Sequence, residues 1–109
     1  TEAIAPVTVS SSATSFDTFA QKTTNGAVYY LVSKNASEGH YAVNEVFVAF
    51  GSDNITTSNA GFVSTKGTNQ IAVTSEIKDD TELTGDIKIS STSGASTTVS
   101  AYMIKLHAS

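Results

Sequence analysis

The side chains best suited to chemistry in this sequence are a group of acidic residues. Asp79, Asp80 and Glu82 lie within four positions of one another, and hard cations such as Ca²⁺ bind carboxylate and carbonyl oxygens. Their spacing lacks the Asp-x-Asp-x-Asp-Gly pattern of a dedicated calcium loop. These three residues are the calcium candidates of the chain, and a solvated acidic loop between two strands is the alternative use of such a cluster.

Groups that could catalyse a reaction are few and scattered. The two histidines, His40 and His107, are far apart in the chain, and no Gly-x-Ser-x-Gly nucleophile motif occurs. Glycoside hydrolysis needs two carboxylates at a set separation, and nothing in the spacing of Glu38, Glu45 and Glu76 singles out a pair. We therefore expect no catalytic residues, no metal, no cofactor and no enzymatic activity.

Composition narrows the class of partner. The 109-residue chain has a net charge of -4 and no arginine, and its six lysines are dispersed. A surface that binds phosphate groups needs clustered cations, so nucleic acid and anionic membranes are poor candidates for partners. The absence of cysteine excludes disulfides and thiolate chemistry.

The central feature of the sequence is a long hairpin over residues 27–51. Both arms are rich in Val, Tyr and Phe, which favour pleated, half-buried surfaces. Asn35 and Gly39 lie in the polar break between the arms, and both residue types favour chain reversal. Because this segment holds the densest apolar run, we expect it to form the middle of a sheet.

Shorter strands are expected around this hairpin, and no segment has a helical pattern of useful length. Alternating or β-rich stretches predict them at Val7–Val9, Ser15–Ala20 (or a single turn there, capped by Asp17), Ile55–Val63 at a sheet edge, Gln70–Ile77, Thr84–Ser90 and Thr97–Leu106. In the Thr84–Ser90 strand, Ile87 and Ile89 should face inward and Asp86 outward. Seven or eight such strands predict an all-β, antiparallel β-sandwich or jelly-roll-like fold over residues 15–109, preceded by an arm or linker at 1–14.

Four segments resemble a small domain that recurs in virion structural proteins of tailed bacteriophages, especially marine and T4-like ones. They are Phe16-Asp17-Thr18-Phe19, Ala27 to Val32, Tyr41 to Gly51 with Glu45 before its apolar run, and Gly85 to Ile89 followed by Ser93 to Val99. The resemblance covers residues 15–104 and implies a β-sandwich module of a phage particle. Such a module would be assembled in the host cytoplasm and then carried on the extracellular virion, and the resemblance brings no catalytic residues with it.

The resulting functional hypothesis is a non-enzymatic virion component, such as a capsid decoration or a tail or fibre-associated domain, that binds other virion proteins. Apolar groups on both faces of Thr97–Leu106 indicate a strand covered on two sides or one that packs on a partner chain. The arm at 1–6 is a second contact candidate, and a homo-oligomer is expected, a trimer by analogy with such proteins. The candidate interface residues are Val99, Ala101, Met103, Tyr102 and Ile104.

The alternative hypothesis is a receptor- or glycan-binding module at a fibre tip. Four tyrosines could stack on sugar faces, although tyrosines in strands more often pack in a core. This alternative predicts that exposed aromatic and acidic groups gather at one end of the sandwich. The loops that would supply them are Ser33–His40 and Asp79–Glu82.

Overall fold

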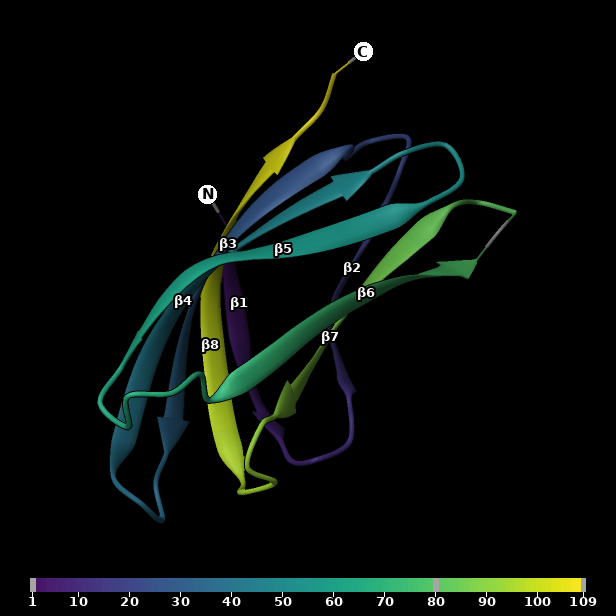
Figure 1. The fold of residues 1–109 in the computed structure, drawn as a ribbon. Helices are drawn as coiled ribbons and strands as arrows, with labels where there is room; N and C mark the ends of the chain where they lie inside the picture. The colour runs from purple at the N-terminus through teal and green to yellow at the C-terminus, as the bar shows by residue number, and fades with distance from the viewer. Residues whose placement is uncertain (1, 80, 109) are drawn as a thin grey trace.

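A computed structural model describes residues 2–79 and 81–108 and shows eight antiparallel strands in two layers (Figure 1). The strands are β1 Glu2–Val9, β2 Thr14–Ala20, β3 Gly26–Asn35, β4 His40–Phe50, β5 Ile55–Ser64, β6 Ile71–Asp79, β7 Thr84–Ser91 and β8 Thr97–Leu106. The expected antiparallel β-sandwich is confirmed. The described part of the chain has no helix that could cross a membrane.

The larger sheet has five strands in the order β1-β8-β3-β4-β5. The expected hairpin is present, with β3 and β4 paired from Gly26 opposite Ala49 to Asn35 opposite His40. Gly39 has a φ of 71° in its turn, a conformation that glycine adopts at little steric cost. The hairpin lies at the middle of the sheet and β5 lies at its edge, as the sequence predicts.

The smaller sheet has three strands in the order β2-β7-β6 and covers one face of the larger sheet. Alternating apolar residues of both sheets meet between them, because successive side chains of a strand point to opposite faces. Ile71, Ile87 and Ile89 come from the smaller sheet and Tyr29 and Met103 from the larger one, and all five are fully buried. The core therefore uses only one face of the five-stranded sheet.

One expectation about the chain is corrected. Glu2–Val9, expected to lie in an N-terminal arm or linker, forms an edge strand whose backbone pairs with β8. The sequence predicts only Val7–Val9 of this strand, because Pro6 interrupts the pattern before it and the register shifts between Ile4 and Val7. Asp86 faces away from the core as the sequence predicts, but it is only 4% exposed, because β7 is the central strand of its sheet and Ser15 Oγ donates a 2.6 Å hydrogen bond to Asp86 Oδ1.

Candidate functional site

The most prominent surface feature is the face of the five-stranded sheet that points away from the core, which we call the outer face. Large apolar side chains remain partly or mainly exposed there, including Tyr102 at 61% and Val43 at 54%. Contiguous apolar patches of this kind are uncommon on monomers and mark interaction surfaces. Its exposed apolar members are Tyr30, Val32, Tyr41, Val43, Phe47, Val63, Tyr102, Ile104 and Leu106.

Strand register places these side chains in rows across the sheet. Val32 lies opposite Val43, and Val43 lies opposite Val63, so three valines from three strands form one row. In the next row, Tyr30 of β3 lies opposite Tyr102 of β8. Directly opposed residues have Cβ atoms about 4.5–5.5 Å apart, so the apolar surface is continuous over the middle of the sheet.

The outer face is hollowed at two places. The first hollow has a volume of about 320 Å³, is lined mainly by apolar groups and lies where Tyr30, Tyr102, Val32 and Val43 surround the small side chain of Ser100. The second has a volume of about 430 Å³ and lies toward the β5 edge, beside Gly61 and Val63. Both hollows could receive protruding side chains of a partner.

Charge is nearly absent from this surface. At the outward-facing positions of the five strands, over the residues that the structure describes, the charged side chains are one lysine, Lys34 on β3, and one carboxylate, Glu45 on β4. The Lys34 ammonium nitrogen lies 5.8 Å from the ring centre of Tyr41, at cation–π distance. The surface therefore combines a broad apolar area with one charge of each sign.

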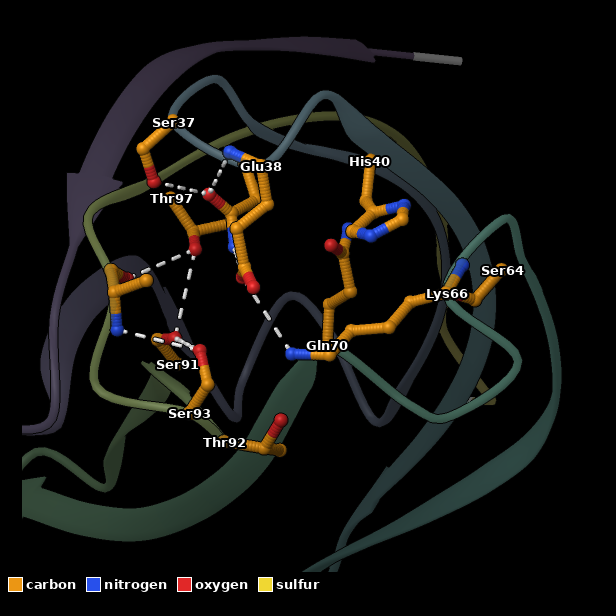
Figure 2. Close-up of polar contacts among 12 residues, drawn as sticks. Ser37, Glu38, His40, Ser64, Lys66, Gln70, Ser91, Thr92, Ser93 and Thr97 are labelled. Carbon is orange, nitrogen blue, oxygen red and sulfur yellow. Dashed lines mark hydrogen bonds and ion pairs between the residues drawn. The ribbon is translucent and has the colours of Figure 1, made fainter.

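A second cluster, made of polar side chains, lies at the end of the sandwich where the β3–β4, β5–β6 and β7–β8 turns meet (Figures 1 and 2). The Asn35 side chain donates to Glu38 Oε1 at 2.5 Å and accepts from Ser37 Oγ at 3.0 Å. Glu38 also lies 3.5 Å from the Lys66 ammonium, which joins two of the turns. These polar groups are occupied in bonding the turns to one another.

The same end is tied to the sheets by further hydrogen bonds. Gln70 Nε2 donates to Ser33 Oγ at 3.1 Å, and Thr92 Oγ1 donates to the backbone oxygen of Asn69 at 2.7 Å (Figure 2 shows Gln70 and Thr92). His40 Nδ1 lies 3.2 Å from Thr65 Oγ1. The arrangement gives this end a structural role and assembles no recognisable set of acid, base and nucleophile.

The predicted interface residues on β8 divide into two groups. Val99, Ala101 and Met103 are 0%, 5% and 1% exposed and pack in the core of the chain itself, so their assignment to a partner interface is corrected. Tyr102 and Ile104 point to the outer face and remain available to a partner. Strand alternation shows which residues share a face, but only the pairing of whole sheets decides which face is covered.

The calcium candidates do not form a visible metal site in the described part of the chain. Asp79 Oδ1 accepts hydrogen bonds from the backbone nitrogens of Thr81 and Glu82 at 2.9 and 3.3 Å, which is a turn-stabilising arrangement. Asp80 lies outside the described residues. No group of three or more His, Asp or Glu side chains able to hold a metal ion occurs among residues 2–79 and 81–108.

The three glutamates considered for catalysis are not brought together. Glu38 lies in the β3–β4 turn, Glu45 on the outer face, and Glu76 on β6 in an ion pair with Lys88 at 2.5 Å. The hydrogen bond to the Glu76 carboxylate, together with its negative charge, raises the pKa of the Lys88 ammonium. His107 is exposed just beyond β8.

The loops that the glycan-binding alternative requires also lie apart. The turn after β3 is at one end of the sandwich, whereas the start of β7 is at the other (Figure 1). In agreement, the Gln21 backbone nitrogen at the second end donates to the Leu83 oxygen at 2.9 Å. Four exposed aromatic residues, Tyr30, Tyr41, Phe47 and Tyr102, lie on the outer face, and Phe62 lies on the other side of β5. The described residues therefore do not gather aromatic and acidic groups at one loop-built end.

The outer-face residues on β3 and β4 are not among the interface residues that the sequence predicts. The sequence places Val32, Val43 and Phe47 in a hairpin in the middle of the sheet. The available signal was the near-continuous run Val28 to Val32, where apolar residues occupy both alternating positions. Such a run indicates a strand apolar on both faces, and here only one of the two faces is covered.

Comparison with known proteins gives little further guidance. No protein-family model matches the chain, and no curated protein sequence matches it. Among solved structures, it is similar to the tailspike protein of Acinetobacter phage vB_ApiP_P1, with a TM-score of 0.42 and 12% sequence identity. The alignment covers 94% of this chain and 19% of the tailspike chain, and a likeness this distant assigns no function.

Proposed function

We propose that this chain is a non-enzymatic structural component of a bacteriophage virion, in the form of a capsid decoration or a tail or fibre-associated domain, and that it acts through protein–protein assembly. The observation that carries the proposal is the outer face, a broad apolar surface with two hollows and one charge of each sign. The assignment to a phage particle rests on the resemblance of four segments of this chain to a domain of phage virion proteins.

The apolar composition of the outer face favours a protein partner. Burying apolar surface is worth roughly 25 cal/mol per Å², and the aromatic side chains Tyr30, Tyr41, Phe47 and Tyr102 belong to types enriched in interface cores. An apolar surface of another protein, with side chains that enter the two hollows, would complement the outer face.

The polar groups of the chain support a structural role over a catalytic one. Asn35, Glu38, Lys66 and Gln70 bond to one another or to neighbouring turns. Asp17 bonds to Tyr29, and Asp86 bonds to Ser15. Side chains held in this way stabilise the fold.

The test is whether the protein is part of the particle. Phage particles whose genome encodes this chain would be purified by density gradient, washed in high salt and analysed by quantitative mass spectrometry and immunogold labelling. We expect a stoichiometric copy number that survives the wash. Recovery of the protein only from the host lysate, and not from washed particles, would contradict the proposal.

A matched pair of variants makes the test specific to the outer face. Val43→Asp places a charge in the centre of the apolar surface, whereas Lys78→Asp changes an exposed position on β6, away from it. We expect Val43→Asp to reduce incorporation into particles and Lys78→Asp to leave it unchanged, with circular dichroism confirming that both variants fold.

A further inference from the structure

We infer that the outer face binds a second copy of this chain, face to face around a two-fold axis, an inference that rests on the assembly role proposed above. The starting observation is the placement of the two outer-face charges. Lys34 lies opposite Tyr41, Val32 opposite Val43, and Tyr30 opposite Glu45, in three successive outward-facing rows. Lys34 and Glu45 therefore lie on adjacent strands, one row to either side of the Val32–Val43 pair.

This placement is self-complementary. Consider a two-fold axis that lies between two facing sheets and passes over the midpoint of the Val32–Val43 pair. If the axis is perpendicular to the line from Lys34 to Glu45, the rotation exchanges the positions of these two residues. Each Lys34 then lies over Glu45 of the second copy, which gives two equivalent ion pairs around an apolar centre. Isologous interfaces require this reciprocal relationship, in which residue i contacts j and j contacts i.

The same axis gives a reasonable packing angle between the sheets. With strands about 4.8 Å apart and about 3.4 Å per residue, the line from Lys34 to Glu45 is inclined about 20° to the strands. The rotation doubles that inclination, so strands of the two copies cross at about 40°. Aligned sheet packing in β-sandwiches has a crossing angle of about −30°, so the flat-lattice value is similar in magnitude.

Large side chains then meet small ones. On the same idealised lattice, the axis places Tyr41 of each copy over the Gly61–Val63 segment of the other, where the hollow of about 430 Å³ lies. Tyr30 falls over the strip formed by Thr98 and Ser100, and Tyr102 falls between Ser100 and the neighbouring strand β1, both beside the hollow of about 320 Å³. Protruding rings are thus set against hollows and short hydroxyl side chains, as close packing requires.

The available area fits a stable dimer. Five strands of about ten residues form a face of about 24 by 33 Å, or roughly 800 Å². Standard protein–protein interfaces bury about 800 Å² on each partner. Two copies that cross at about 40° overlap over part of this face, and a two-fold axis pairs one face with one other. This geometry therefore gives a dimer and not the trimer expected by analogy.

Charge reversal tests the arrangement directly. The dimerisation constant of the wild-type chain and of K34E, E45K and the double variant K34E/E45K would be measured by sedimentation equilibrium at low salt. In a dimer with reciprocal Lys34–Glu45 pairs, each single reversal creates two like-charge contacts, so we expect each to weaken dimerisation by about tenfold or more. The double variant restores both pairs with the charges exchanged and should return to within about threefold of the wild type.

Matched controls separate this effect from net charge. Lys78 and Glu82 are exposed and lie away from the outer face, so K78E, E82K and K78E/E82K change the net charge by the same amounts. We expect these controls to dimerise like the wild type. Circular dichroism of every variant confirms that the fold is retained.

A chemical cross-link gives an independent test, because the chain contains no cysteine. The axis places Val43 of one copy against Val43 of the other, so V43C should be joined into a dimer by a short bismaleimide, whereas K78C should not.

A chain that stays at the 11.3 kDa monomer mass at all concentrations overturns the inference. A trimer, or a dimer in which the double reversal fails to rescue the single ones, overturns it as well. A monomer that is nevertheless incorporated into particles leaves the proposed function intact, so the two failures are distinguishable.

Discussion

The hydroxyl of Tyr29 donates a 2.7 Å hydrogen bond to Oδ2 of Asp17 and thereby joins the two sheets. Tyr29 lies on β3 of the larger sheet and is 1% exposed, whereas Asp17 lies on β2 of the smaller sheet and is partly buried. Burial raises the pKa of Tyr29, and the neighbouring Asp17 carboxylate raises it further. The phenol therefore stays protonated and remains a hydrogen-bond donor.

Removing that donor should destabilise the sandwich. Tyr29→Phe keeps the ring that packs edge-on against Phe16 but leaves the partly buried Asp17 carboxylate without its tyrosine partner. We expect the free energy of unfolding to fall by about 1–3 kcal/mol, measured by urea denaturation at pH 7. Unchanged stability would show that solvent replaces the hydroxyl at Asp17.

The pH dependence of stability should reflect Asp17. Burial raises its pKa above the ordinary value of 3.8, and the Tyr29 hydrogen bond only partly opposes this effect. Between pH 3.8 and the raised pKa, the folded state binds more protons than the unfolded state, so stability falls as pH rises. The contribution of Asp17 to stability is therefore fully present below pH 3.8. It is lost as the pH rises through the raised pKa. Asp17→Asn should therefore be more stable than the wild type at pH 7 and similar to it below pH 3.8.

Urea denaturation measured about every half unit of pH from pH 3 to pH 7 checks this prediction. The quantity compared is the slope of the free energy of unfolding against pH. Thr74→Ala, which removes no titratable group from its exposed position, provides the control and should not change the difference between low and neutral pH. If the wild type and Asp17→Asn differ by the same amount at every pH, Asp17 is not the group responsible.

Two glycines should respond in opposite ways to the same substitution. A Cβ at Gly85 would lie 2.7 Å from Ile55 Cδ1 and 3.0 Å from a ring carbon of Phe50, whereas a Cβ at Gly61 meets nothing within 4 Å. Gly85→Ala should cost about 1–3 kcal/mol through overpacking. Gly61→Ala should be neutral or stabilise by up to about 1 kcal/mol, because alanine reduces the freedom of the unfolded chain. Thermal unfolding of the two variants compares them directly, and equal melting temperatures would contradict the prediction.

The smaller sheet should be energetically essential although it has only three strands. Ile89 on β7 is fully buried in the shared core, so Ile89→Ala should lower the free energy of unfolding by about 2–5 kcal/mol. Thr74→Ala, at an exposed position of the neighbouring strand β6, should change it by less than about 0.5 kcal/mol. Chemical denaturation checks both values, and a small effect at Ile89 would mean that the larger sheet is stable alone.

Local patterns in the sequence predicted the strands, because alternation and turn residues are local properties. The β3–β4 hairpin follows from its Val, Tyr and Phe content and from the turn between Asn35 and His40. That turn also fixes the register, so the relation between Lys34 and Glu45 is in principle available from the sequence. The exposed edge position of β5 follows from its few large apolar groups.

Properties that depend on pairing between distant segments could not be predicted in the same way. The sequence does not show that β1 pairs with β8, which lies about 100 residues away, or that β7 is a central strand whose neighbours bury Asp86. Asp17 was considered as a cap for a local turn, and its actual partner, Tyr29, lies on the other sheet. For the candidate site, alternation grouped Tyr102 with Ile104 and Val99 with Met103, but only the packed sandwich shows which group is exposed.

The position of β8 in the larger sheet has a consequence for the order of folding. β8 lies between β1 and β3, and it is synthesised after both of them. Within residues 2–79 and 81–108, β8 is the strand of the larger sheet that pairs with β1, so β1 joins that sheet only when β8 has been inserted. Such non-local pairing slows folding, typically to milliseconds or seconds. Until that step, a chain emerging from the ribosome can form the β3–β4–β5 meander while its first strand remains unpaired, and β8 completes the sheet.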